Sequence, residues 1–319
     1  NDNINTWTYS VFAQADFQLA QGWQITAGAS YNKSFIGIDR LSVPGFIPRN
    51  KTFSNEIAPR LSVAKKITPD LLVYASVSKG FSPPAVGEVL PSNQSINTDL
   101  QPEQGINYEA GLKSGFPDQR LYAEITGFWF QLQKAIVVRK DLFNSDYYIN
   151  AGATRQQGIE SQLSYQLVDR PGPVLTSARL WLSYTLNRFT YHDFKKNAID
   201  YSGKHLPGVA NNTIAGGLDL FSKPGIFLHL TYYYSDKLPL DDANSAYAGS
   251  YQLLGGKVGY KTNAFKKINL SLFAGIDNAF NTKYSLGNDI NAAGGRFYNA
   301  APGVNYFAGL TISCSKARR

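Results

Sequence analysis

The sequence predicts an all-β protein, an antiparallel transmembrane β-barrel, and three observations support this prediction. Long segments alternate apolar and polar side chains with a period of two, which is typical of strands with one apolar face. Aromatic residues make up 13% of the 319 residues and charged residues only 17%, so the second face is mildly polar. Short turns alternate with long loops between the predicted strands, as in barrels of the bacterial outer membrane.

The clearest example lies near the end of the chain. From Ile268 to Asp277, one face carries Ile, Leu and Ala, and the other carries Asn, Ser, Phe, Gly and Asp. A long loop rich in Gly, Asn and aromatic residues follows, and a second strand runs from Tyr306 to Ile312. This unit of two strands joined by a long loop repeats along the chain.

The same alternation predicts thirteen strands in total. They cover residues 6–19, 23–39, 55–65, 71–81, 105–116, 120–138, 147–167, 175–194, 209–221, 226–234, 250–261, 268–277 and 306–312. Six short turns alternate with six longer loops, and a soluble propeller or sandwich would not sort its loops in this way. Several strands exceed the roughly 9–11 residues that span a bilayer, so we expect them to project above the membrane.

The direction of the first and last predicted strands indicates whether these residues form a whole barrel or part of one. The first predicted strand runs into a short turn and the last one leaves a long loop, so both run toward the periplasm. Single-chain bacterial barrels have an even number of strands, and this sequence contains no Met. We therefore expect residues 1–319 to form one domain, the C-terminal part of a larger barrel.

Charge and reactive residues disfavour several classes of function. The net charge is +8, but Lys and Arg are spread along the chain, so we expect no nucleic-acid partner and only a weak preference for anionic ligands or lipid headgroups. One Cys forms no intrachain disulfide, and the spacings of His192, His205 and His229 match no metal motif. Two Ser-x-x-Lys segments lie in strands, where residues three apart face opposite sides. We expect no enzyme activity, no cofactor and no metal site.

Several segments, taken in order, resemble the barrel of TonB-dependent outer-membrane receptors, in particular those for siderophores. They are residues 81–88 (FSPPAVGE), 97–103 (NTDLQPE), 107–113 (NYEAGLK), 150–160 (NAGATRQQGIE), 277–284 (DNAFNTKY) and 296–309 (RFYNAAPGVNYFAG). The resemblance covers most of the chain. Two features depart from the family pattern: the 319 residues contain no plug and no TonB box, and the sequence ends in KARR where an aromatic residue is usual.

The resemblance implies a fold, a location and partners. The fold would be a plugged barrel of about 22 strands, with the plug and the first strands outside residues 1–319. The location would be the bacterial outer membrane. The partners would be a ferric siderophore or similar small ligand, TonB acting through the missing N-terminal segment, and outer-membrane lipid.

Aromatic and cationic loop residues are the candidates for the ligand-binding mouth. These are Tyr147, Tyr148, His192, Lys204, His205, Arg296, Phe297 and Tyr298. Charge and cation–π contacts from such residues would hold an anionic, aromatic ferric chelate. Packing between loops is the alternative role for each of them.

Two further polar positions allow a prediction. His229 alternates with Leu228 and Leu230, so we expect it to face the barrel interior. Asp241, Asp242 and Asn244 supply oxygen atoms of the kind that bind calcium, but a solvated acidic loop is the favoured interpretation.

Other functions stay open at this level. The polar faces of the strands would also suit a passive porin. A third hypothesis is a structural or secretion-associated barrel that does not transport a ligand. Within the resembling family, the ligand is open between a ferric siderophore, cobalamin, haem and a glycan, because the loops that select it are poorly readable from sequence.

Overall fold

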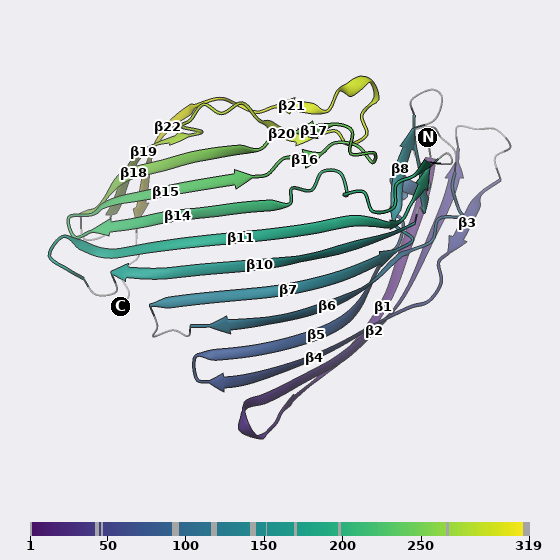
Figure 1. The fold of residues 1–319 in the computed structure, drawn as a ribbon, viewed down its shortest axis with the longest axis horizontal. Coiled ribbons are helices and arrows are strands. Elements are labelled where there is room, and N and C mark those ends of the chain that lie inside the picture. The colour runs from purple at the N-terminus through teal and green to yellow at the C-terminus, as the bar shows by residue number, and fades with distance from the viewer. Residues whose placement is uncertain are drawn as a thin grey trace.

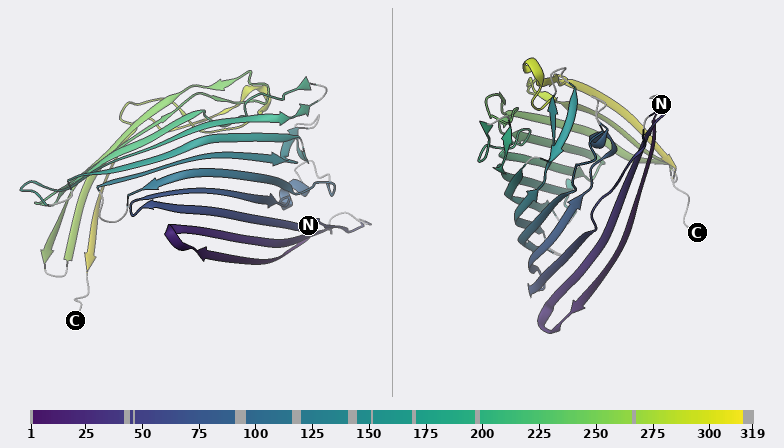
Figure 2. Two further views of the ribbon diagram at one scale, coloured as in Figure 1. Left: turned by 60° about the horizontal axis from the view of Figure 1, so that its bottom comes forward. Right: turned by 90° about the vertical axis from the view of Figure 1, so that its right-hand side faces the viewer.

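One curved antiparallel sheet dominates the protein in the computed structural model (Figure 1). The structure describes residues 2–41, 45, 47–90, 96–115, 120–140, 145–150, 152–168, 171–196, 199–265 and 268–314. Thirteen strands, here called the wall, follow one another through the sheet in chain order, and each pairs antiparallel with the next. The prediction of thirteen antiparallel strands is confirmed. The sheet does not close on itself, since β1 and β22 form its two edges (Figure 2).

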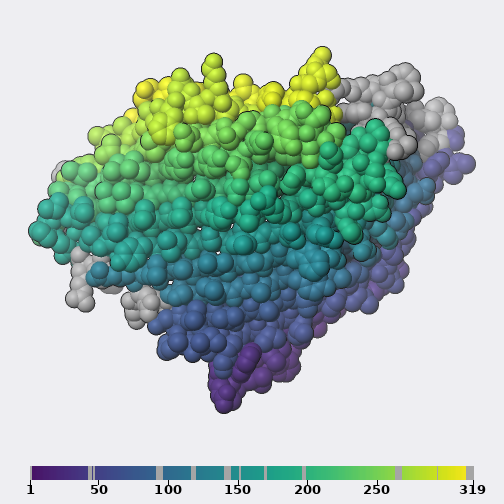
Figure 3. Space-filling view, viewed as in Figure 1, coloured from purple at the N-terminus to yellow at the C-terminus, as the bar shows by residue number. Residues whose placement is uncertain are grey.

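The wall strands are long and are joined at one end by short turns. They are β1 (Asp2–Gln18), β2 (Trp23–Arg40), β4 (Glu56–Thr68), β5 (Leu71–Ser82), β6 (Glu103–Ser114), β7 (Leu121–Gln133), β10 (Ala153–Val168), β11 (Leu175–Asp193), β14 (Asn212–Ser222), β15 (Ile226–Ser235), β18 (Tyr251–Phe265), β19 (Ile268–Asp277) and β22 (Asn305–Cys314). In the space-filling view these strands lie side by side across the molecule in chain order (Figure 3).

The long connections gather at the other end of the sheet, at the right of Figure 1, and form what we call the outer layer. Its elements are short: β3 (Arg49–Thr52), α1 (Val86–Val89), β8 (Ile136–Lys140), β9 (Asp146–Asn150), β12 (Lys195–Lys196), β13 (Ile199–Asp200), β16 (Leu238–Pro239), β17 (Tyr247–Ala248), β20 (Ser285–Asn288), the 3-10 turn η2 (Ala293–Gly295) and β21 (Tyr298–Ala300). The 3-10 turn η1 (Ala20–Gly22) belongs to the opposite end. Among the described residues, no helix is long and apolar enough to cross a membrane.

Two strand predictions were wrong. The sequence predicted single strands over residues 120–138 and 147–167, but β8 and β9 leave the wall and pair only with each other. The wall strand β7 ends next to Lys134, which has a φ of 54°, and β10 begins after Gly152, which has a φ of 64°. A Cβ atom at Gly152 would lie 1.5 Å from the carbonyl oxygen of Asp193, so only glycine fits this turn. The side chain of Asn150 fixes the departure by donating a 2.7 Å hydrogen bond to the carbonyl of Lys134.

The two faces of the wall differ in chemistry. By register, Leu272 lies opposite Leu310 and Tyr260, and these three apolar side chains are 45–61% exposed. Exposed large apolar residues of other strands share this outer face: Tyr9, Leu61, Val77, Tyr108, Trp129, Ile159, Leu182 and Val258. An exposed apolar band of this kind faces lipid, and the opposite face, with Asp16, Glu124 and His229, is luminal. The predicted luminal position of His229 is confirmed, since it lies opposite Asp219 and Lys257.

Aromatic rings cover glycines on the luminal face. A Cβ atom at Gly217 would lie 2.7 Å from the Trp181 ring, and one at Gly309 would lie 2.4 Å from the Phe273 ring. The same arrangement recurs in Gly105–Phe130, Gly111–Tyr74, Gly158–Phe128, Gly259–Phe227 and Gly275–Phe307. Each glycine therefore provides the space in which a ring from the neighbouring strand lies against the wall.

Buried apolar clusters lie at the loop end. One contains Ile36, Ile38, Phe53, Val89 and Leu100, from β2, the β3 region, α1 and the segment that follows it. The other is centred on Tyr191 and Phe194, at the end of β11. The outer layer is thus packed like the interior of a soluble domain, whereas the wall is a single layer of sheet.

Candidate ligand-binding site

A buried ionic network joins four connections of the outer layer. Its centre is Asp242, between β16 and β17, which is 4% exposed. The Tyr191 hydroxyl donates a 2.8 Å hydrogen bond to Asp242 Oδ1, and Asn291 Nδ2 donates another at 3.0 Å. Arg139 Nη1, from β8, lies 3.6 Å from Asp242 Oδ2. These four residues come from the connections β7–β10, β11–β14, β15–β18 and β19–β22 or their edges, so the network ties these loops together.

Aromatic rings cover the arginine of this network. The guanidinium carbon of Arg139 lies 4.7 Å from the centroid of the Phe194 ring, which is stacked on Tyr191 at 4.3 Å. Phe194 is fully buried. A charged pair enclosed in this way depends on its partners, because removal of either charge leaves the other one buried and uncompensated.

The acidic loop was interpreted wrongly as solvated. Asp242 is buried in the network, and the carboxylate of Asp241 accepts a 2.7 Å hydrogen bond from the backbone N–H of Ser245. The side chain of Asn244 is also engaged, since it donates to the carbonyl of His205 at 2.9 Å. Within the described part of the chain, no three His, Cys, Asp or Glu side chains are grouped so as to hold a metal ion.

Three of the eight predicted mouth residues lie on the side of β9 and β11. Tyr147 and Tyr148 are on β9, and Tyr148 packs against the Ile36 cluster while its carbonyl accepts a 2.9 Å hydrogen bond from Asn97. His192 lies near the end of β11, with its Nδ1 3.5 Å from Arg155 Nη2 on the outer face of the wall. The structure does not bring His192 together with the other two.

The other five predicted residues lie in loops that contact one another. The backbone N–H of His205 donates a 2.8 Å hydrogen bond to Asn244, so the β11–β14 and β15–β18 loops meet there. Lys204, beside it, is exposed. Arg296, Phe297 and Tyr298 precede or begin β21, and the Tyr298 hydroxyl donates to the carbonyl of Tyr247 at 3.2 Å. The β19–β22 loop is thereby joined to the β15–β18 loop.

Two adjoining pockets lie on the luminal wall just below these loops. The first, of about 500 Å³, is lined among others by Trp181, Thr231, Tyr233, Asp277 and Tyr284. The second, of about 470 Å³, shares Tyr284 and Leu286 with the first and adds Tyr251, Lys283 and Tyr298. Tyr251 stacks on Tyr284 at 4.9 Å and lies 5.9 Å from Tyr233. We call the luminal surface around Tyr233, Tyr251 and Tyr284 the tyrosine wall, as distinct from the wall of thirteen strands that carries it.

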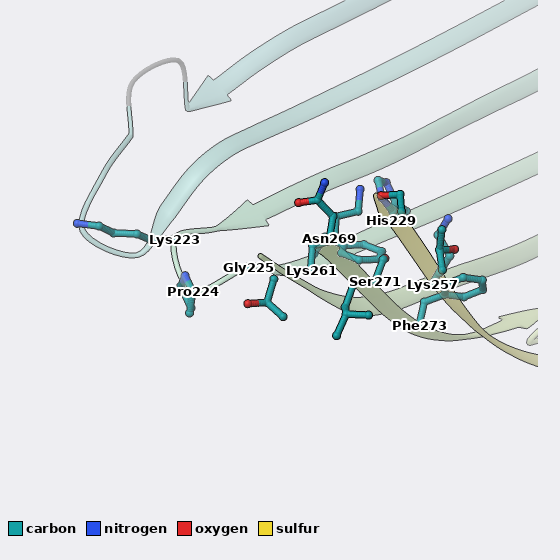
Figure 4. A pocket seen from close by; sticks show the side chains of 14 residues that line it. Lys223, Pro224, Gly225, His229, Lys257, Lys261, Asn269, Ser271 and Phe273 are labelled. Atoms are coloured by element: carbon teal, nitrogen blue, oxygen red, sulfur yellow. The ribbon is translucent and has the colours of Figure 1, made fainter. Parts of the chain in front are cut away.

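A third luminal pocket, of about 730 Å³, lies at the end of the short turns (Figure 4). Lys257, Lys261 and His229 line it together with the rings of Phe227 and Phe273. Lys261 Nζ lies 5.0 Å from the centre of the Phe227 ring, and Lys257 Nζ lies 5.4 Å from that of Phe273. Within the described residues, neither lysine has a carboxylate in ion-pairing distance, so this pocket carries an uncompensated positive charge.

Asp219, which contacts His229 at the edge of that pocket, is already engaged. Asp219 accepts hydrogen bonds from Arg179 Nη2 at 2.7 Å and Nε at 3.1 Å, and its other oxygen lies 2.6 Å from His229 Nδ1. The lumen is therefore aromatic and phenolic below the loops and cationic toward the short turns. Such a surface suits anions with aromatic groups.

Comparison with known proteins decides the family. The family model described as "TonB dependent receptor-like, beta-barrel" matches residues 1–279. The chain belongs to the TonB-dependent receptor family. The receptor accordingly lies in the bacterial outer membrane, and the predicted family, fold class and location are confirmed.

Relatives of the receptor are known in sequence and in structure. It is 33% identical to the metal-pseudopaline receptor CntO of Pseudomonas aeruginosa over 112 residues, 35% of the receptor chain and 15% of CntO. It is 24% identical to the ferric-pyoverdine M114 receptor PbuA of Pseudomonas sp. strain M114 over 269 residues, 79% of the chain and 30% of PbuA. The siderophore receptor PiuA of Acinetobacter baumannii has a similar fold, with a TM-score of 0.77 at 19% identity over 98% of the chain and 44% of PiuA. The chain thus spans less than half the length of these proteins.

Sequence reasoning missed the residues that form the luminal pockets of the receptor. For Trp181, Tyr233 and Tyr251 a signal existed, because each is an aromatic residue on the polar face of an alternating strand. Asp242 was noted only as part of an acidic loop, and no comparable signal marked Arg139 and Asn291 as its partners, since the three residues come from different loops and meet only in the folded protein.

Proposed function

We propose that the receptor imports an anionic, aromatic metal chelate, in the first place a ferric siderophore, with energy supplied through TonB. The observation that carries this proposal is the tyrosine wall beneath the outer loops. Its rings offer stacking surfaces and its hydroxyls offer hydrogen bonds, which is what the aromatic groups of a chelate require. Family membership supports the class of function, and the siderophores after which the receptors PbuA and PiuA are described support the class of ligand.

The mouth above the tyrosine wall would make the first contact with the ligand. In this proposal the exposed side chains of Lys204 and Arg296 attract the anionic chelate, and Tyr298 stands between the loops and the second luminal pocket. His205 and Phe297 hold the loops beside them. Tyr147, Tyr148 and His192 were also predicted as mouth residues. In this proposal Tyr147 and Tyr148 lie at the margin of the mouth, and His192 takes no part because it lies on the outer face of the wall.

The metal need not be iron. The name of CntO describes a receptor for a metal complex without naming iron, and CntO is 33% identical to part of this chain. Chelates of other first-row metals therefore belong in the same test as ferric ones.

The proposal is tested by uptake of labelled chelates into cells that carry the native receptor, with and without functional TonB. We expect TonB-dependent uptake of at least one aromatic chelate, and expression that rises when that metal is scarce. Trp181→Ala and Tyr284→Ala should each weaken chelate binding by about tenfold, the order expected for the loss of one aromatic contact. Tyr260→Ala, on the lipid-facing side, is the matched control and should change binding little.

Two outcomes would contradict the proposal. Steady conductance in planar bilayers together with TonB-independent uptake would indicate a passive pore. Binding of haem, cobalamin or a glycan, with no binding of any metal chelate of a siderophore type, would keep the family but change the substrate.

A further inference from the structure

We propose that the outer, lipid-facing side of the wall carries a groove that binds a phosphorylated, multiply acylated glycolipid of the outer leaflet. The groove measures about 690 Å³ and crosses strands β5, β6, β7, β10 and β11. It lies on the face opposite to the luminal pockets. The inference therefore depends on the outer-membrane location and is independent of which ligand the receptor imports.

The walls of the groove are apolar. Tyr108 and Trp129 form one side, with ring centroids 5.7 Å apart and more than 40% of each side chain exposed. Ile159 and Leu186 continue the lining toward β11. Extended side chains of this type at the membrane boundary suit the upper part of acyl chains.

The floor of the groove is low because small residues meet there. Ala75 pairs with Ala110, and Ala110 pairs with Gly127, so three small residues lie in one row across three strands. A Cβ atom at Gly127 would have only the carbonyl oxygen of Ala110 within 4 Å, at 3.9 Å. The seven ring-covered glycines described above lie in the lumen, whereas Gly127 on the outer face has open space above it.

Two arginines lie at the end of the groove that points to the outer loops. Arg188 lines the groove opposite Gln157, and Arg155 occupies the next outer-face position on β10. Arg188 is exposed, and the Nε of Arg155 makes no hydrogen bond within the described residues. His192 lies beside Arg155, with Nδ1 3.5 Å from Nη2. Guanidinium groups arranged in this way suit phosphate oxygens.

The carboxylates near the groove do not cancel this charge. Glu109 lines the groove but lies on a luminal register position and accepts a 2.7 Å hydrogen bond from Asn107. Asp236, beyond the end of β15, is the acid that Arg188 influences. Hydrogen bonds from Asn212 and Tyr234 hold the pKa of Asp236 below its usual value, so it stays ionised and offsets one of the two arginines.

The depth of the arginines in the membrane fits a headgroup. Along β10, ten residues separate Tyr165, near the short turn, from Arg155 (165 − 155). At about 3.4 Å per residue and a strand tilt of roughly 40°, this corresponds to a height of roughly 25 Å, which is the height of the apolar band of such barrels. With Tyr165 placed at the inner boundary of this band, Arg155 comes to lie at its outer boundary, at the level of lipid phosphates.

The test measures lipid retained by the native receptor after purification in a mild detergent. Bound phosphorylated glycolipid is quantified by native mass spectrometry and by its hydroxylated acyl chains, and phospholipid is quantified in parallel. We expect about one retained glycolipid per receptor, and a loss of about tenfold in the double variant Arg155→Gln with Arg188→Gln, because two charge-assisted contacts disappear. Gly127→Leu, whose side chain would fill the floor of the groove, should also lower the amount of retained glycolipid.

Lys65→Gln is the matched control. Lys65 lies on the same outer face but near a short turn, 5.0 Å from the Trp23 ring, and should not affect glycolipid retention. Heat-dependent migration in gels shows that each variant is folded, and chelate uptake should stay unchanged in all of them. Equal retention by the double arginine variant, or retention of phospholipid in place of glycolipid, would overturn the proposal.

Discussion

Two arginine–aspartate pairs occupy two regions of the molecule and differ in their surroundings. In the outer layer, the side chains of Arg139 and Asp242 are 4% and 5% exposed, and aromatic rings cover the arginine. In the wall, Arg179 and Asp219 form a shorter contact of 2.7 Å, but their side chains are 53% and 13% exposed and face the lumen. The two pairs have the same chemistry, and both aspartates are largely buried, but the arginine is buried in the outer layer and half exposed in the wall.

This difference reflects how each region is held together. The wall is held by backbone hydrogen bonds between strands, and its side chains have lipid or lumen around them. The outer layer is held by side chains from several loops that bury one another. We therefore expect substitutions in the outer layer to lower the stability of the folded protein more than chemically similar substitutions in the wall.

The largest effect is expected for Arg139→Ala. It removes the Arg139 charge beside the buried Asp242 carboxylate, which costs about 3–5 kcal/mol of local stability. Hydrogen exchange of the amides in residues 199–211 and 236–250 should accelerate accordingly. The double variant Arg139→Met with Asp242→Leu removes both charges and should be much milder; equal effects of the single and double variants would contradict the buried pair.

Gly309→Val should have the next largest effect. The new side chain would enter the space of the Phe273 ring and force it off the wall, at a cost of about 1–3 kcal/mol from overpacking. The loss should appear as a lower unfolding temperature of the receptor in detergent micelles. Gly287→Val, where a Cβ atom meets nothing within 4 Å, is the control.

A smaller effect is expected for Arg179→Gln, which breaks the wall pair. Because this arginine is half exposed, the loss should be about 0.2–1 kcal/mol and should shrink as salt is added. Chemical denaturation at low and high salt measures it. A loss as large as that of Arg139→Ala would mean that burial does not separate the two regions.

The smallest effect is expected for Leu272→Ile on the lipid face. Leu272 is 60% exposed in the isolated chain and has lipid as its partner in the membrane, and isoleucine keeps the same apolar volume against that lipid, so the change in stability should stay within about 0.5 kcal/mol. Unfolding of the receptor in lipid bilayers is the appropriate measurement. A loss of several kcal/mol would show that another polypeptide packs on this face.

The same contrast explains what the sequence could predict. Alternation follows directly from a wall with one apolar and one polar face, and so the thirteen strands and the luminal side of His229 were predicted correctly. The β8–β9 hairpin was missed because its apolar pattern runs on from the wall strands, and nothing in the type of residue at Lys134 signals its positive φ.

The candidate site was predictable only in part. Residue type and loop position predicted Lys204, Arg296 and Tyr298 as mouth residues, and these three stay predictions. The burial of Asp242 could not be predicted, because it depends on partners from several loops that no local pattern connects. The tyrosine wall could have been predicted, because the strands that carry Tyr233 and Tyr251 were predicted correctly. What was missed is that aromatic residues on the polar face of these strands line the lumen.

The rings that rest on glycines determine the clearance of the lumen. A ring lying against a glycine rises little above the backbone, so the free width at Gly217, Gly275 and Gly309 is set by the strands and hardly by side-chain rotamers. A large solute that moves along this part of the lumen meets a flat surface, and no side chain has to change its rotamer to let it pass. This flat surface restricts the sequence, because a residue larger than glycine at any of these positions would collide with the ring that covers it.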